Sequence, residues 1–362
     1  MSDPRKDPSR RCLPVEEWPC PDREAWNNAI RAGDLLDGSG AAAHWREGTR
    51  KKVQSSYGRY LTFLKRKGAL NSATGPETRV TPDLLRAYIE ELRETVSPVS
   101  LAGRITDLSE ALRVMVPDHH FPFLRRAQQA LAAQAKAIRN KRQRIQPPAD
   151  LFDLGIRLMS EAERNPCPRP VWRACRYRDG LMIAMLAARA LRRRNFAGII
   201  LGKHLRKVDN RYVFMFDGSE TKNHRPIEMS LPSPLTGYID RYLEHYRPIL
   251  LGAAQSDHLW ISSMARPMAH GAIYDKVREV TERELGRPVN LHLFRDCQAT
   301  ALAIEDPEHV RIAAAILGHT NLRTTEKYYN QARMLEAVRR HQDCLVSLRR
   351  DLKRSPRHVR RR

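Results

Sequence analysis

The chain has 362 residues, which is long enough for two domains that each bury a core of their own. It carries 64 Lys and Arg against 41 Asp and Glu, a formal net charge of +23, and its pI is near 10.3. An excess this large repels itself within one molecule and therefore favours a polyanionic partner, with nucleic acid the leading class. No apolar run is long enough to span a bilayer, and the start of the chain lacks the apolar core of a signal peptide. The six cysteines show neither a C-x-x-C pair nor zinc-like spacing with histidines, so reduced thiols in a cytoplasm are expected.

The first part of the chain divides into a leader and a helical domain. Residues 1–40 are rich in Pro, Gly and charge, which predicts a basic, irregular leader that is helical only around Asp22–Ala32. From residue 41 to residue 145, apolar residues recur at helical spacing. Thr81-Pro82 and Ser97-Pro98 each combine a capping residue with a proline suited to the first helical position. We therefore expect a four-helix domain over residues 41–145.

Two prolines at 147 and 148 predict a linker over residues 146–150, followed by a second domain over residues 151–362. Helical periodicity covers residues 151–164, 172–189, 233–251, 270–285 and 332–352. Between them, aromatic residues alternate with Val213 and Met215 over residues 212–216, and apolar residues alternate with Glu228 and Ser230 over residues 227–231, which is typical of strands. The fold class that follows is mainly α, with one small antiparallel sheet and a hairpin around Glu220–Arg225.

The stretch from His292 to Tyr328 concentrates the residues suited to chemistry. His292 and Arg295 are three apart, so on a helix they share a face. Asp306 and Pro307 predict the start of a second helix, and Gly318 is suited to its end. His319 then follows a tight corner, and Tyr328 comes nine residues later.

This order of residues resembles the active site of tyrosine recombinases, the phage integrase family. The matching positions are Arg192, Lys222, His292, Arg295, His319 and Tyr328. H-x-x-R and L-G-H are each weak signals, but together, correctly spaced and followed by the tyrosine, they are specific. Three positions depart from the family pattern: Ala190 replaces a glycine, Asn195 a glutamate and Asp296 a histidine. The helical domain ahead of a proline-containing linker resembles the core-binding (DNA-binding) domain of the same family.

The chemistry of these residue types suits a phosphodiester. Two guanidiniums, Arg192 and Arg295, can hold its non-bridging oxygens with paired donors while staying charged. His292 and His319 can donate hydrogen bonds to the same phosphate or move a proton. Tyr328 is the expected nucleophile, which forms a covalent phosphotyrosyl link.

Other interpretations remain open for several of these residues. Arg192 lies in a run of three arginines that can simply face solvent or a DNA backbone. Tyr329 is a neighbouring tyrosine, but adjacent helical residues point in different directions and the spacing selects Tyr328. Lys222 matches the hairpin lysine of the family and is expected to protonate the leaving 5′-hydroxyl. Its rivals nearby are Lys203, Lys207 and Arg225.

The resemblance implies site-specific DNA recombination, in integration or excision of a mobile element, through a 3′-phosphotyrosyl intermediate without a metal or nucleotide cofactor. The partner is double-stranded DNA, held by two domains that act as a clamp, with a homo-tetramer assembled on the DNA. Residues after Tyr328 are expected to dock onto a neighbouring protomer, and accessory recombinases or DNA-bending proteins can take part. Two alternatives are a type IB topoisomerase and a non-cleaving DNA-binding protein of the same fold.

Overall fold

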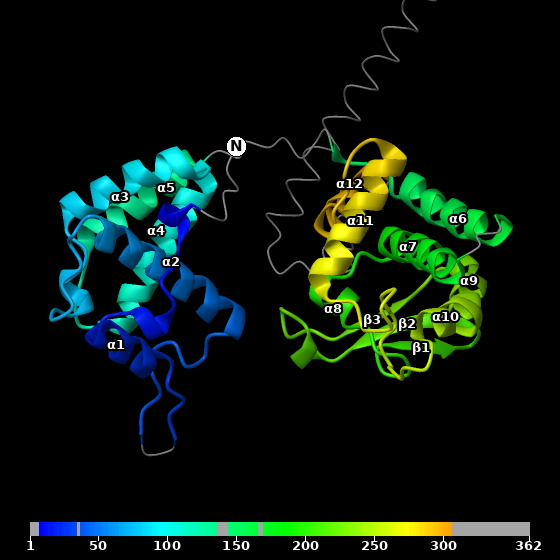
Figure 1. The fold of residues 1–362 in the computed structure, drawn as a ribbon, viewed down its shortest axis with the longest axis horizontal. Helices are drawn as coiled ribbons and strands as arrows, with labels where there is room; N and C mark the ends of the chain where they lie inside the picture. The colour runs from blue at the N-terminus through cyan, green and yellow to red at the C-terminus, as the bar shows by residue number, and fades with distance from the viewer. Residues whose placement is uncertain (1–6, 35–36, 136–143, 166–168, 306–362) are drawn as a thin grey trace, which may run out of the picture. The chain divides into compact units, whose positions relative to one another are not determined.

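The chain folds into two compact units, Met1–Asn140 and Lys141–Arg362 (Figure 1). The structure is a computed structural model, and it describes residues 7–34, 37–135, 144–165 and 169–305. None of the helices within these ranges combines the length and the apolar character needed to cross a membrane. The mainly helical fold class with a small antiparallel sheet is confirmed.

The first unit is built around helix α4. Its described helices are α1 (Cys20–Ile30), α2 (Glu47–Arg66), α3 (Pro82–Thr95), α4 (Pro98–Met115) and α5 (Pro122–Gln134). Helix α4 contacts the other four, so it forms the centre of the unit. The predicted starts at Thr81-Pro82 and Ser97-Pro98 are present, and the hydroxyls of Thr81 and Ser97 accept backbone N–H bonds at 3.3 Å. These caps satisfy donors that the first helical turn leaves unpaired.

The leader differs from the irregular segment that its composition suggested. Helix α1 occupies most of the stretch 22–32, and Leu13, Trp18 and Trp26 are buried in the core of the first unit. The ring of Trp18 contacts that of Tyr57 on α2, with 5.0 Å between centroids. Large aromatic side chains bury enough apolar area to order a segment that is otherwise polar. Helix α1 lies where a helix was expected in the leader, and α2 to α5 are the four helices expected over residues 41–145.

A buried ion pair ties this leader to the rest of the unit. Arg79 Nη2 donates to Asp22 Oδ2 at 2.6 Å, and Tyr57 OH donates to Asp22 Oδ1 at 2.5 Å. The side chains of Arg79 and Asp22 are only 1% and 0% exposed. Arg79 also donates to the carbonyls of Asn71 and Thr74, so the buried guanidinium is well supplied with acceptors.

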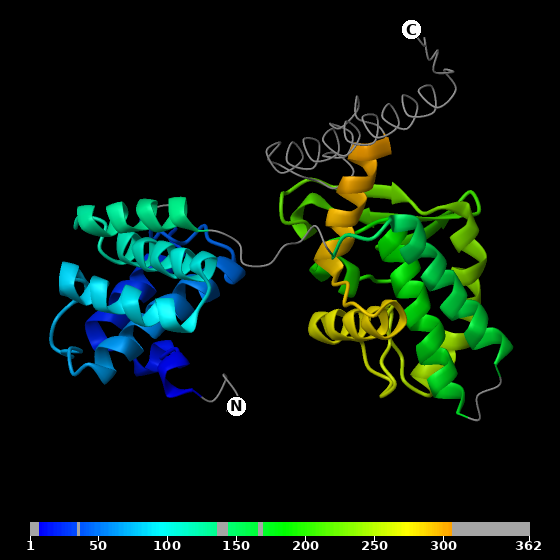
Figure 2. The ribbon, with the colours of Figure 1, turned by 90° about the horizontal axis from the view of Figure 1, so that it is seen from above.

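The second unit packs its helices around α7. They are α6 (Pro148–Arg164), α7 (Pro170–Ala188), α8 (Arg193–Ala197), α9 (Thr236–Arg241), α10 (Arg247–Leu251), α11 (His270–Leu285) and α12 (Leu291–Glu305). Helices α6 and α7 lie side by side (Figures 1 and 2). They approach closely because each has a glycine at the contact: a Cβ on Gly155 would lie 2.7 Å from the carbonyl oxygen of Gly180. Pro148 is the first residue of α6 and so lies in the helix, two residues before the expected end of the linker.

The sheet has three antiparallel strands in the order β1 (Leu205–Val208), β2 (Arg211–Phe216) and β3 (Ile227–Ser230). Strand β1 was not anticipated, because it is short and mostly exposed. It turns into β2 through Asp209 and Asn210, which both have positive φ, as a two-residue type I′ hairpin requires. Strands β2 and β3 are joined by residues 217–226, which include the 3-10 turn Gly218–Glu220 and Lys222.

Candidate active site

The backbone just before Arg192 is held by helix α12. Arg295 Nη1 donates to the carbonyl oxygen of Ala190 at 2.6 Å, and the N–H of Ala190 donates to Gln298 Oε1 at 3.2 Å. Gln298 Nε2 also donates to the carbonyl oxygen of Ala187 at 2.6 Å. Helix α12 thus binds both backbone groups of Ala190, although more than 100 residues separate Ala190 from Arg295 and Gln298 in the chain. Arg192 follows two residues later, at the N-terminus of α8.

The first departure from the family pattern has a simple structural account. Ala190 is 4% exposed and does not belong to the described residues that have positive φ. A glycine is needed where φ is positive or where a Cβ has no room, and neither condition holds here. Alanine at position 190 therefore costs the local backbone nothing.

Arg192 and Arg295 form a concentrated positive site. Arg295 is 7% exposed, and its burial, together with the charge of Arg192, lowers the pKa of Arg295 to about 10. Burial also lowers the pKa of Arg192, which is half-buried. Both guanidiniums are still charged at neutral pH. Each therefore holds its charge although burial has removed part of its hydration and a like charge lies nearby. An anion bound between them would relieve both penalties.

His292 lies on the same helix as Arg295, close to the start of α12. Asn290 caps this helix, since its Oδ1 accepts the N–H of Leu293 at 3.0 Å. His292 is exposed, and Arg295 follows one turn later. The spacing of three places both residues on one helix a turn apart, with His292 exposed and Arg295 buried.

The hairpin that carries Lys222 reaches Arg192. Asn223 Oδ1 accepts from Arg192 Nη1 at 3.4 Å, at the long end for a hydrogen bond. Lys222 itself is exposed. Its two lysine rivals are each held by a carboxylate: Lys203 Nζ lies 2.6 Å from Glu220 Oε1, and Lys207 Nζ lies 2.8 Å from Asp240 Oδ2. Lys222 is next in sequence to Asn223, the residue that contacts Arg192, and its role stays a prediction.

Sequence patterns did not indicate two further residues that organise this region. Gln298 binds the segment before Arg192, and Glu220 anchors the hairpin before Lys222. Asn195, noted only as a departure from the family, is buried and donates from Nδ2 to the carbonyl oxygen of Glu220 at 3.2 Å. Their partners are distant in sequence, so no local spacing marks them.

The remaining predicted residues, His319 and Tyr328, lie outside the described residues, as does Tyr329. Their assignments stay predictions. In the parts of the chain that the structure does describe, no three His, Cys, Asp or Glu side chains are grouped so that they could hold a metal ion.

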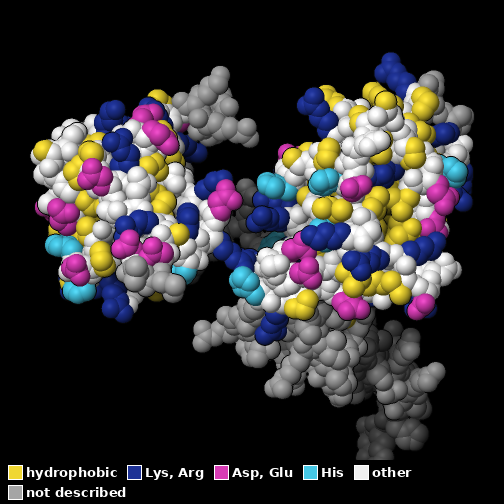
Figure 3. Space-filling view, turned by 90° about the horizontal axis from the view of Figure 1, so that it is seen from below, with side chains coloured by type: hydrophobic (Ala, Val, Ile, Leu, Met, Phe, Trp, Pro, Cys, Tyr) yellow, Lys and Arg dark blue, Asp and Glu magenta, His cyan; other side chains and the backbone are white. Residues whose placement is uncertain are grey.

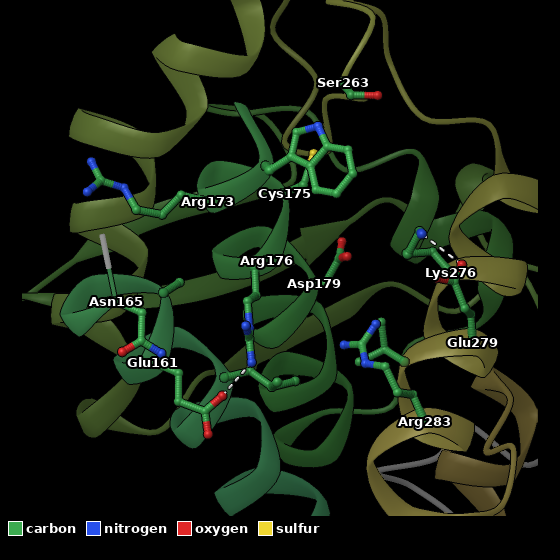
Figure 4. A pocket seen from close by; sticks show the side chains of 14 residues that line it. Glu161, Asn165, Arg173, Cys175, Arg176, Asp179, Ser263, Lys276, Glu279 and Arg283 are labelled. Carbon is green, nitrogen blue, oxygen red and sulfur yellow. Dashed lines mark hydrogen bonds and ion pairs between the residues drawn. The ribbon is translucent and has the colours of Figure 1, made fainter. Parts of the chain in front are cut away.

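A separate hollow of about 780 Å³ lies between α6, α7 and α11 (Figure 4). Its charged lining is largely paired, as Arg176 with Glu161 and Lys276 with Glu279 at 2.6 and 2.7 Å. It reaches along α7 only as far as Asp179, roughly 14 Å along the helix axis from the end of α7 that precedes Arg192. Arg192, Lys222, His292 and Arg295, the predicted site residues that the structure describes, do not line this hollow.

Comparison with known proteins gives a consistent assignment. Residues 157–335 match the model of the phage integrase family. The chain is 30% identical over 152 residues to tyrosine recombinase XerC 2 of Ralstonia nicotianae, a match that covers 42% of each protein. It is 26% identical over 291 residues to tyrosine recombinase XerD of Chlorobaculum tepidum, which covers 77% of this chain and 84% of that one.

A solved structure supports the same fold. The XerH site-specific recombinase bound to difH substrate superposes with a TM-score of 0.54 at 12% sequence identity. The superposition covers 80% of this chain and 78% of XerH. The matched region contains every predicted site residue, and the chain belongs to the phage integrase family.

Proposed function

We propose that the chain is a tyrosine-type site-specific DNA recombinase. The phenolic oxygen of Tyr328 attacks a phosphodiester, bonds to phosphorus and releases the 5′-oxygen of the next nucleotide, which leaves as a hydroxyl after receiving a proton. The product is a 3′-phosphotyrosyl link, and attack by another 5′-hydroxyl reverses the step and rejoins the strand. The observation that carries the proposal is the pair Arg192 and Arg295, partly dehydrated and held together through Ala190.

The arginine pair suits the charge that develops during cleavage. Attack on the phosphate concentrates negative charge on its non-bridging oxygens, where fixed donors stabilise the transition state most. Arg295 is already oriented by its bond to Ala190, so little reorganisation accompanies the reaction. His292 and His319 donate hydrogen bonds to the same phosphate or accept the proton of Tyr328, and Lys222 protonates the leaving oxygen.

The partner is double-stranded DNA, in keeping with the net charge of +23 and with the substrate-bound state of the similar XerH structure. On the face shown in Figure 3, basic side chains are spread over both units with acidic side chains between them. Phosphate contacts from such side chains give affinity without sequence selectivity. The working form is a homo-tetramer on two duplexes in the cytoplasm, assisted by accessory recombinases or DNA-bending proteins.

Covalent trapping tests the proposal. Duplexes selected for binding from a randomised pool are nicked, so that the short 5′-hydroxyl fragment diffuses away after cleavage and the adduct accumulates. The wild-type protein should form an SDS-resistant adduct, and Tyr328→Phe should form none while it binds DNA with nearly unchanged affinity. Tyr329→Phe is the matched control and should still form the adduct.

Three other results would contradict the proposal. Loss of the adduct in Tyr329→Phe but not in Tyr328→Phe would move the nucleophile by one residue. DNA binding without any adduct would indicate a non-cleaving protein of the same fold. An adduct accompanied by efficient relaxation of supercoiled DNA at concentrations where the protein is monomeric would indicate a topoisomerase.

A further inference from the structure

The carboxylate of Glu220 joins parts of the second unit that meet at the hairpin. Glu220 ends the 3-10 turn Gly218–Glu220, two residues before Lys222. Its Oε1 accepts from Lys203 Nζ at 2.6 Å and from His204 Nε2 at 3.0 Å. Its Oε2 accepts the backbone N–H of Asp217 at 3.2 Å. One side chain therefore holds both the start of the hairpin loop and the segment before β1.

His204 is a rigid anchor for this carboxylate. Its ring is buried and stacked on Phe216, with 4.6 Å between ring centroids and 12° between ring planes. The N–H of Ile200 and the carbonyl oxygen of Gly198 each lie 3.1 Å from Nδ1, on the side of the ring away from Glu220. The imidazole cannot turn away without losing the stack and these bonds.

The backbone of Glu220 is tied to the helix that begins beside Arg192. Asn195, on α8, donates to the carbonyl oxygen of Glu220 at 3.2 Å. Helix α8 begins directly after Arg192. Asn195 therefore links the position of the hairpin to the position of this arginine.

The loop beyond Glu220 is closed across its base. Thr221 Oγ1 donates to the carbonyl oxygen of Arg225 at 2.7 Å, and Thr221 is buried. A Cβ on Gly218 would lie 2.7 Å from the carbonyl oxygen of His224, so the two sides of the loop are in contact. Lys222 lies between these closures, so whatever orients Glu220 and Thr221 also sets where the Lys222 backbone lies.

We propose that Glu220 is a positioning residue, whose carboxylate fixes the hairpin so that the Lys222 ammonium can give its proton to the leaving 5′-oxygen. This inference rests on the proposed function. The ammonium becomes a neutral amine as the phosphorus–oxygen bond breaks and the oxygen leaves as a hydroxyl. A displacement of about 1 Å at a reacting group can cost about 100-fold in rate.

Glu220 does not supply the proton itself. The bonds from Lys203 and then from His204 lower the pKa of Glu220 to about 2, so its carboxyl group is ionised at neutral pH. Its effect on cleavage is therefore expected to pass through the placement of Lys222.

The test measures single-turnover cleavage of two substrates by the full chain. One substrate has the natural bridging 5′-oxygen, and the other has sulfur at that atom, which leaves as a thiolate without a proton. Glu220→Gln should cleave the oxygen substrate about 10- to 100-fold more slowly than wild type and the sulfur substrate at nearly the wild-type rate. Lys222→Ala should show the same selective loss. The double variant should be no slower on oxygen than Lys222→Ala alone, because Glu220 acts through Lys222.

Asp240→Asn is the matched control. Asp240 accepts from Lys207 at 2.8 Å and from the hydroxyl of Tyr212 at 2.8 Å, so it also joins a lysine and a ring donor at this sheet. It is not in the hairpin, so its variant should cleave both substrates at wild-type rates. Glu220→Asp keeps the charge but shortens the side chain, so its cleavage rate should fall less than that of Glu220→Gln and only on the oxygen substrate. This variant provides the test if Glu220→Gln folds poorly.

The outcomes separate the inference from the proposed function. A wild-type protein that forms no phosphotyrosyl adduct on either substrate overturns both. If sulfur rescues Lys222→Ala but leaves Glu220→Gln and Glu220→Asp equally slow on both substrates, Glu220 has only a structural role and the inference fails. Wild-type rates for both Glu220 variants on oxygen, or an additive double variant, overturn it as well.

Discussion

Replacing Asp22 with alanine tests how the first unit is held together. Asp22 is fully buried and accepts from Arg79 and from Tyr57, so its removal leaves a buried guanidinium without its counter-charge and a buried hydroxyl without its acceptor. The carbonyls of Asn71 and Thr74 still bind Arg79, but they carry no net charge.

The expected loss follows from these contacts. Breaking a buried ion pair by removing one partner costs about 3–5 kcal/mol of stability. This figure includes the cost of leaving the Tyr57 hydroxyl without an acceptor. The free energy of unfolding of a domain of this size is about 5–15 kcal/mol. Asp22→Ala should therefore lower the stability of the first unit by a large part of that value. The exposed pair Lys51 and Glu47, 2.5 Å apart with side chains 73% and 75% exposed, provides the contrast. Glu47→Ala should cost at most about 1 kcal/mol.

Urea unfolding followed by tryptophan fluorescence measures both variants. Trp18 and Trp26 lie in the core of the first unit, and Trp18 contacts Tyr57, so their fluorescence follows the unfolding of this unit, beside that of Trp260 in the core of the second. The double variant Asp22→Ala/Arg79→Met should recover at least half of the loss, since it removes both charges. If Asp22→Ala shifts the transition no more than Glu47→Ala does, the ion pair contributes nothing beyond a surface contact and the reasoning is wrong.

Three further predictions concern the second unit and the chemistry. Cleavage should persist in excess EDTA because Arg192 and Arg295 already supply positive charge at the phosphate; a magnesium-dependent recovery of adduct formation would contradict this. Gln298→Leu leaves two buried backbone groups unpaired and should lower the unfolding free energy of the second unit by about 2 kcal/mol while slowing cleavage more than it weakens DNA binding. Equal effects on rate and affinity would argue against a role in placing Arg192. Truncation after Asn330 should impair the higher-order complex in gel-shift titrations more than single-site binding, and complex formation at wild-type concentrations would exclude docking by this segment.

Local signals predicted much of the fold. The helix starts at Thr81-Pro82 and Ser97-Pro98 were right because a cap and a first-turn proline act within a few residues of each other. The alternation in residues 212–216 and 227–231 predicted strands β2 and β3 for the same reason.

Other features depend on contacts between distant residues. The leader looked irregular from its composition, yet Trp18 and Trp26 order it by burial against helices that come later in the chain. Glu220 and Gln298 carry no motif, because their significance comes from Lys203, His204 and Ala190, which only the folded chain brings to them. Spacing marked the groups expected to touch the phosphate, and the residues that hold those groups became visible only in three dimensions.

The contacts at Ala190 also bear on how this site can diverge in evolution. Helix α12 binds the N–H and the carbonyl oxygen of residue 190, and the Ala190 methyl group belongs to the core of the second unit. Position 190 should therefore accept a small apolar residue, glycine or alanine, whereas a branched side chain would have to fit where Ala190 is already buried. Arg295 and Gln298 face the opposite constraint, since each must reach a fixed backbone atom. Alanine-to-glycine exchange at position 190 should therefore leave Arg192 in place, whereas a change at Arg295 or Gln298 removes one of the bonds that hold this segment.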